Sequence, residues 1–290
     1  MSEWPLVAFT LLVQSSVGVV IFSALYFCWI EKEVGTQQST TIMKPVLILA
    51  AILGCLGLLA STLHMGYPWN AFHALRHISS SWLSREVVFA AVYLGALCLY
   101  TLVVLIKGRM NNTILALIGL LGLIDIYCMA SLYFNTSMVT WMHVNTYFMF
   151  FGSVFATGGA IALGLTTKRS RTLISVELTN KLVVSALLVI FLAFVIRMTV
   201  QPFYLEWLSN IVINSNAITF PQSPEIAYTG TFLLRLSAWS WGIIGILLLG
   251  YQAWKNRSVT FIASTQIITL ACIIIFISEI LNRFAFFIVK

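Results

Sequence analysis

The residues best suited to chemistry lie in one stretch, Ser61 to Glu86, between two long apolar segments. This stretch contains three of the four histidines, two arginines and a glutamate. In the whole chain only 9% of residues are charged and 60% are hydrophobic. A cluster of ionisable groups at the edge of a membrane-like segment is a candidate functional site.

His64 and Glu86 border this stretch, one at the end of an apolar segment and the other at the start of the next. An imidazole titrates near neutral pH and can accept a proton from a quinol hydroxyl, while a nearby carboxylate can orient it or relay the proton. Each residue also has a structural interpretation. His64 can be an interfacial side chain, and Glu86 can be a first-turn acid favoured by the helix dipole behind an N-cap at Ser84.

His73 and His77 are four residues apart, with Arg76 between them, which puts both histidines on one face of a short helix. A zinc or haem pair is one interpretation, but no carboxylate or thiol completes the set, and a wet helix at the interface is favoured. The five cysteines lie in apolar runs without a CxxC pair, which indicates packing thiols. We therefore predict neither a metal site nor a haem in this protein.

Hydropathy predicts an all-α, polytopic transmembrane bundle in which residues 1–290 form a single domain. The eight predicted spans are 5–30, 42–63, 86–106, 113–134, 141–165, 181–200, 229–252 and 259–289. The N-terminus has no basic segment and no A-x-A-like cleavage site, so we expect the first span to be retained.

Basic residues divide unequally between the two sides of such a bundle. The loops of one side carry ten, namely Lys32, Lys44, Lys107, Arg109, Lys168, Arg169, Arg171, Lys181, Lys255 and Arg257. The other side carries three, namely Arg76, Arg85 and Lys290. Since cytoplasmic loops are enriched in Lys and Arg, both termini and the histidine-rich stretch are predicted to face outward. The net charge of +7 is thus attributed to topology and not to a nucleic-acid partner.

Five further ionisable residues lie away from the inner and outer ends at which the groups named above are placed. Counting along the helices puts Arg197, Arg235, Glu279 and Arg283 in the outer half of the membrane and Asp125 near the midplane. Glu279 and Arg283 are spaced for an i, i+4 pair, or Arg283 helps to shape a polar pocket for a ring carbonyl. Arg197 and Arg235 have no acid nearby in the sequence and need partners from other helices.

Four segments resemble a known family: EWPLVAFTLLVQ at the N-terminus, LASTLHMGYPWNAFHALRH, the SSWLSREVVF that follows, and SEILNRFAFF near the C-terminus. They are similar to the membrane-anchor subunits of dimethyl-sulfoxide reductases, the DmsC family. The resemblance runs from end to end in length and span number and is most specific over residues 58–90.

The resemblance implies an eight-helix subunit, in the bacterial inner membrane, that anchors a molybdopterin catalytic subunit and a four-cluster iron–sulfur subunit. It implies that the anchor oxidises menaquinol near the periplasmic face in anaerobic respiration, passes the electrons to the iron–sulfur subunit and carries no haem. The terminal reduction would take place on a partner subunit. His64 would be the proton acceptor and Glu86 its companion, and the quinol-binding set is predicted to be His64, Arg76, Ser84, Arg85, Glu86, Glu279 and Arg283.

Three other functions remain open. A quinol-oxidising anchor with haem b would need histidines on facing spans, which His64 and His143 could supply only at the outer edge. A secondary transporter usually has repeated halves and helices interrupted near the midplane, whereas the prolines here are predicted at span ends or in loops. The third is a passive assembly anchor, in which replacement of His64 would have no effect.

Overall fold

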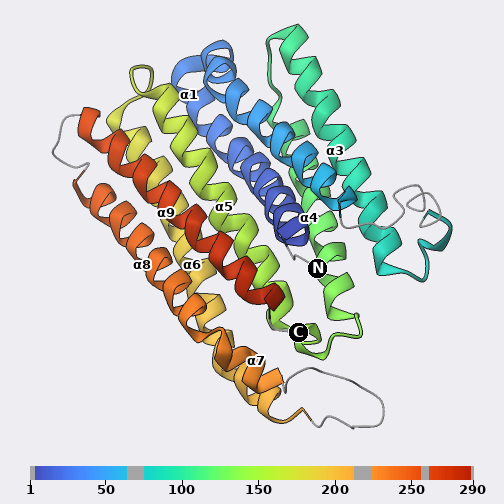
Figure 1. The fold of residues 1–290 in the computed structure, drawn as a ribbon. Helices are drawn as coiled ribbons and strands as arrows, with labels where there is room; N and C mark the ends of the chain where they lie inside the picture. The colour runs from blue at the N-terminus through green and yellow to red at the C-terminus, as the bar shows by residue number, and fades with distance from the viewer. Residues whose placement is uncertain (1–3, 64–74, 212–223, 256–260, 289–290) are drawn as a thin grey trace.

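The computed structural model describes residues 4–63, 75–211, 224–255 and 261–288, and this part of the protein is helical without β-strands (Figure 1). In order, the helices are α1 (Trp4–Thr62), the 3-10 helix η2 (Leu75–His77), α3 (Trp82–Lys107), α4 (Asn112–Phe134), the 3-10 helix η3 (Val139–Trp141), α5 (Asn145–Ser170), α6 (Val176–Ser209), α7 (Pro224–Gly230), α8 (Phe232–Lys255) and α9 (Phe261–Ile288). Seven of them, namely α1, α3, α4, α5, α6, α8 and α9, are long and apolar enough to cross a membrane. The prediction of a polytopic helical membrane protein is therefore confirmed.

Helix α1 folds back on itself at Gly35. This residue has φ 79° and ψ 166°, a backbone conformation that favours glycine because it lacks a Cβ. The two arms, 4–34 and 36–62, lie side by side, and the Ser16 hydroxyl donates a hydrogen bond to the Ala50 carbonyl at 2.7 Å. Each arm measures about 40 Å or more at 1.5 Å per residue, so each is long enough to span a bilayer.

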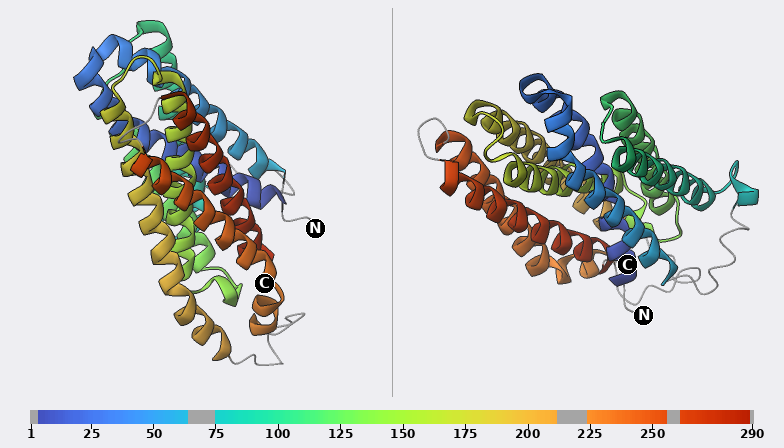
Figure 2. Two further views of the ribbon diagram at one scale, coloured as in Figure 1. Left: turned by 90° about the vertical axis from the view of Figure 1, so that its left-hand side faces the viewer. Right: turned by 90° about the horizontal axis from the view of Figure 1, so that it is seen from above.

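The folded α1 lies at the centre of the bundle, with α3 and α4 on one side and α5, α6, α8 and α9 on the other (Figures 1 and 2). Its closest neighbour is α5. A Cβ atom added at Gly18 or at Gly158 would overlap backbone atoms of the opposite helix, so the two backbones touch at this crossing. Small residues permit this kind of approach between membrane helices.

Gly158→Val should therefore destabilise the bundle by about 3 kcal/mol, at the upper end of overpacking costs, because the backbones of α1 and α5 must separate. Gly95→Val is a matched control, since Gly95 also lies within a helix but has nothing within 4 Å of an added Cβ. The half-time of thermal inactivation of the detergent-purified protein measures the difference. Equal half-times for the two variants would refute the importance of this crossing.

The helix ends form two groups. At one of them, the Gly35 end, the Met110 N–H donates to Thr40 Oγ1 at 3.2 Å and the Ser175 N–H donates to Glu33 Oε1 at 2.6 Å. At the opposite end, the Trp141 end, Trp141 Nε1 donates to the Phe286 carbonyl at 3.2 Å. The turns that join α1's two arms, α3 to α4, and α5 to α6 are thus gathered at the Gly35 end.

Several helix bounds differ from those predicted. Helix α6 continues to Ser209 with Pro202 inside it, although the sequence predicted a loop from 201 to 228, and α7 begins within that same range. Pro45 also lies inside a helix, in the second arm of α1. Beyond Pro202, the Tyr204 hydroxyl donates to the Thr140 carbonyl at 2.7 Å, a tertiary contact that holds the extension. Proline is tolerated in such helices because neighbouring groups compensate for the hydrogen bond it cannot donate.

Candidate functional site

Glu86 lies one turn inside α3 and not at its start. The helix begins at Trp82, and its N-cap is Ser81, whose hydroxyl accepts the Ser84 N–H at 3.4 Å. The predicted N-cap at Ser84 is therefore wrong, and Ser84 is buried within the first turn. Because the first turn of α3 contains no acidic residue, a first-turn role in the helix dipole does not account for Glu86.

The Glu86 side chain is buried, with 4% of its surface exposed. Its Oε1 atom has no hydrogen-bond partner among the described residues. Burial of a carboxyl oxygen without a partner is unfavourable by several kcal/mol at most sites, so such groups usually have a function. Within a membrane helix, a carboxyl of this kind is a functional-site candidate.

The basic residues predicted beside Glu86 have different roles. Arg85 donates to the carbonyls of Ile78 at 2.9 Å and Ser79 at 2.7 Å, and its guanidinium lies 4.2 Å from the centre of the Trp82 ring. Arg85 therefore holds residues 78 and 79 against the first turn of α3. Arg76 is exposed on η2. His64 and His73 lie outside the described residues.

Glu279 and Arg283 belong to a second polar group, on the other side of α1's first arm. Glu279 forms a two-pronged ion pair with Arg197 of α6, with a shortest distance of 2.5 Å, and also accepts from the Ser153 hydroxyl at 2.8 Å. The predicted i, i+4 pairing of Glu279 with Arg283 is thus replaced by a pair between helices, because Arg197 fits against Gly152 of α5. The prediction that Arg197 needs a partner from another helix is confirmed.

Arg283 is almost fully buried and bonds to neutral groups. It donates to Gln14 Oε1 and to Ser153 Oγ, and its guanidinium lies 4.4 Å from the centre of the Phe150 ring. Gln14 also donates to Met129 Sδ of α4 at 3.8 Å, so it connects the second polar group to the α4 side. Among the described residues no contact joins Glu86 to Glu279 or Arg283. Those predicted quinol-binding residues that the structure describes thus lie in two separate places.

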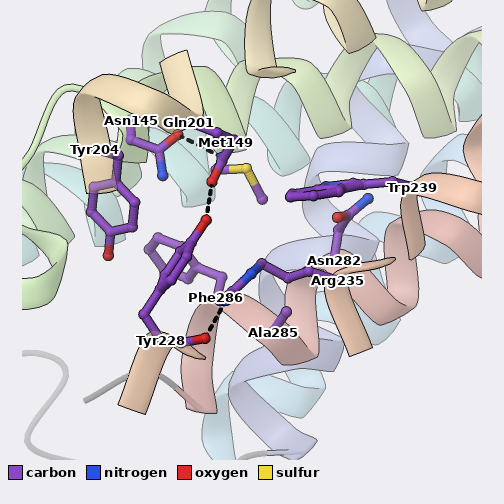
Figure 3. A pocket seen from close by; sticks show the side chains of 10 residues that line it. All are labelled: Asn145, Met149, Gln201, Tyr204, Tyr228, Arg235, Trp239, Asn282, Ala285 and Phe286. Carbon is purple, nitrogen blue, oxygen red and sulfur yellow. Dashed lines mark hydrogen bonds between the residues drawn. The ribbon is translucent and has the colours of Figure 1, made fainter. Parts of the chain in front are cut away.

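A third polar region is a cavity of about 30 Å³, enough for about two water molecules (Figure 3). It is lined by Asn145, Met149, Gln201, Tyr204, Tyr228, Arg235, Trp239, Asn282, Ala285 and Phe286. The Tyr228 hydroxyl donates to Gln201 Oε1 at 2.8 Å, and Arg235 donates to the Tyr228 carbonyl. Sequence reasoning did not find this cavity, although amides such as Asn282 within an apolar run are a signal for it.

His143 lies between α4 and α5, beside this cavity. Its Nδ1 accepts the Asn145 N–H at 3.1 Å, and its ring packs against Tyr204 and Trp207 at centroid distances of 5.4 and 5.2 Å. Burial lowers the pKa of His143 below its usual 6.5. The imidazole of His143 is therefore neutral, and its Nδ1 atom accepts the hydrogen bond. Within the described ranges, no three His, Cys, Asp or Glu side chains are grouped closely enough to hold a metal ion.

Comparison with known proteins gives a match to one protein family and similarity to individual proteins of two bacteria. Residues 1–288 match the family described as "DMSO reductase anchor subunit (DmsC)". The protein is 32% identical over 168 residues to an anaerobic dimethyl sulfoxide reductase subunit of Haemophilus influenzae, covering 56% of this protein and 58% of the relative. It is 30% identical over 167 residues to the anaerobic dimethyl sulfoxide reductase subunit YnfH of Escherichia coli, covering 56% and 57%. A second anaerobic dimethyl sulfoxide reductase subunit of Escherichia coli is 27% identical over 160 residues, covering 54% and 55%.

The aligned part of the protein thus spans between 55% and 58% of these three relatives. The family match covers almost the whole chain, in keeping with the number and length of its apolar helices. The chain therefore belongs to the family of DMSO reductase anchor subunits.

Proposed function

We propose that this anchor subunit binds menaquinol near the periplasmic face of the bacterial inner membrane and oxidises it. The electrons pass to an iron–sulfur subunit and then to a molybdopterin catalytic subunit that reduces the terminal acceptor. The names of the relatives, which are parts of anaerobic dimethyl sulfoxide reductases, support this place in a respiratory complex.

The observation that carries the proposal is the buried carboxyl of Glu86, with an oxygen that lacks a hydrogen-bond partner in the described structure. Oxidation of menaquinol breaks two O–H bonds and releases two protons with the two electrons. A carboxylate inside the membrane edge can accept one of these protons, and His64, predicted from the sequence, is assigned the other. The electrons leave to the iron–sulfur clusters of the partner.

The cavity of about 30 Å³ that Arg235 helps to line is less suited to the oxidation of menaquinol. Its ten lining residues include amides, phenols and one guanidinium but no carboxylate and no histidine. Such a lining can donate hydrogen bonds to an oxygen atom, but it has no group that would accept a quinol proton near neutral pH. We therefore place the reaction at Glu86.

We further propose eight spans with both termini outside, α1 providing two of them. Three turns lie together at the Gly35 end, and they are flanked by Lys32, Lys107 and Arg171. Basic residues at these turns are expected of cytoplasmic loops and support this orientation. A reporter fused at Lys168, near the end of α5, should report the cytoplasm. A reporter fused at Asn210, just after the end of α6, should report the periplasm. The same compartment for both fusions would overturn this topology.

The function itself is tested by changing the electron donor of the complete complex. With this subunit present, a water-insoluble naphthoquinol should drive reduction of the acceptor. A complex isolated without the subunit should keep turnover with reduced viologen, which donates to the catalytic subunits directly, and should lose turnover with the naphthoquinol. Equal naphthoquinol rates with and without the subunit would contradict the proposal.

A further inference from the structure

Asp125 is the most enclosed carboxyl of the described structure, with none of its surface exposed. Neither of its oxygens, Oδ1 or Oδ2, has a hydrogen-bond partner among the described residues. It lies in α4, a helix of apolar composition, and borders a small cavity of about 10 Å³ together with Tyr93 and Ala90. A carboxyl buried this way in a membrane helix requires an explanation in terms of function.

The packing of α4 on α3 brings Asp125 to the level of Glu86. Two contacts bracket this position: the rings of Trp82 and Tyr127 lie 5.9 Å apart, and an added Cβ at Gly122 would lie 2.9 Å from the Tyr93 ring. Because α3 and α4 run antiparallel, the stretch of α3 from Trp82 to Tyr93 lies beside the stretch of α4 from Tyr127 back to Gly122. Glu86 and Asp125 lie within these two stretches and therefore at about the same level. The two carboxyl groups interact electrostatically. The sequence placed Asp125 alone near the midplane, whereas the structure brings it to the level of Glu86.

In the described structure no cation forms an ion pair with either carboxyl, although the charge of Arg85 acts on the neighbouring Cys128. The titratable groups that interact with Asp125 are Glu86 and Tyr93 of α3 and Cys128 of its own helix, and in the described structure α1 and α5 contribute none. Arg85, the nearest cation along the sequence, is bonded to the carbonyls of residues 78 and 79. Two carboxylates facing each other in a low-dielectric region cannot both be ionised without a large free-energy cost.

Among the described residues, three of the four carboxyl oxygens also lack a hydrogen-bond donor. The Tyr93 hydroxyl lies 2.8 Å from Ser16 Oγ, and Ser16 donates to the Ala50 carbonyl, so the phenol proton is directed to Ser16. Three carboxyl oxygens, Oε1 of Glu86 and both of Asp125, remain without a donor in the described structure. A proton carried by one of the two carboxyls would supply the donor that this pair lacks.

We propose that Glu86 and Asp125 share one proton, and that Asp125 acts as the positioning residue that holds Glu86 ready for menaquinol. This inference rests on the proposed function of the Glu86 site. In the resting state the pair carries one proton and one negative charge. When menaquinol is oxidised, one O–H bond breaks toward His64 and the other toward the pair, which becomes neutral. The two electrons go to the iron–sulfur clusters of the partner subunit, and both protons are later released.

Asp125→Asn tests the shared proton in the complete complex. An amide N–H is a weaker donor to a carboxylate than a carboxylic acid O–H, so the singly charged state loses stabilisation. The acidic limb of the pH profile of naphthoquinol turnover should then move toward neutral pH by about one unit. At a fixed pH on that limb, the rate of the variant should be about tenfold lower than that of the wild type. Turnover with reduced viologen reports whether the complex is assembled. Glu177→Gln, at an exposed acid of α6, is the control and should leave the profile unchanged.

Infrared spectroscopy supplies a readout that a packing role would not affect. At neutral pH the wild-type minus Asp125→Asn difference spectrum should contain the carbonyl band of a protonated carboxyl that shifts in deuterated water. Asp125→Glu should restore both the band and the pH limb; it also provides the test if the asparagine variant does not assemble. An assembled Asp125→Asn complex with the wild-type limb and no band in the difference spectrum would overturn the shared proton. If Glu86→Gln itself keeps full naphthoquinol turnover, the proposed function fails and not only this inference.

Discussion

Glu86→Gln should lower naphthoquinol-driven turnover by about 10²–10⁴-fold, the usual contribution of a general acid or base. Glutamine has nearly the same shape as glutamate and can hydrogen-bond, but it cannot take up a proton. Because Glu86 pairs with no cation in the described structure, the neutral side chain should not disturb packing. The rates to compare are those with naphthoquinol and with reduced viologen, measured on the same preparation of the complete complex.

The controls separate proton transfer from assembly. His64→Gln should reproduce the loss, whereas His77→Gln, at an exposed residue of η2, should remain close to wild type. Viologen-driven turnover should stay normal in all three variants. If His77→Gln loses naphthoquinol turnover and Glu86→Gln does not, the site lies further along the histidine-rich stretch and its assignment to Glu86 is wrong.

The overall helical architecture could be predicted because hydropathy reports it directly. Each predicted span overlaps a helix or an arm of α1, and the fold-back lies near the predicted boundary between the first two. The start of α3 was misplaced by four residues, since Trp82, Ser84 and Arg85 interrupt the apolar run while still belonging to the helix. At Pro202 the general rule for proline predicted a helix end, but contacts of the following turn allow α6 to continue.

The contacts of the candidate site were less predictable, because they depend on which helices pack together. Sequence spacing makes Arg283 the natural partner of Glu279, yet Arg197, 82 residues away, occupies that position. Similarly, the proximity of Asp125 to Glu86 arises from the register of α4 on α3, which depends on the fit of Tyr93 against Gly122. Type and approximate depth of an ionisable residue can be predicted from one sequence, whereas its partner requires the tertiary structure.

The second large effect is expected at the ion pair between Arg197 and Glu279. Both side chains are almost fully buried, and Arg283 adds a second positive charge next to them. Glu279→Leu removes the only carboxylate that neutralises this group in the described structure. Breaking a buried pair on one side costs about 3–5 kcal/mol, because an uncompensated charge remains. The variant should therefore yield little assembled complex, with viologen-driven turnover and membrane-bound protein falling together.

Replacing both partners should have a much smaller effect than replacing one. In Arg197→Met/Glu279→Leu, the apolar side chains have similar volume and both charges of the pair are removed, while Arg283 keeps its hydrogen bonds to Gln14 and Ser153, so much of the assembled complex should return. Glu225→Leu, at an exposed acid of α7, controls for the loss of a carboxylate as such. The yield of purified complex and its half-time of thermal inactivation measure both effects. A double variant as unstable as Glu279→Leu would mean that the carboxylate serves Arg283, through Ser153, more than it serves Arg197.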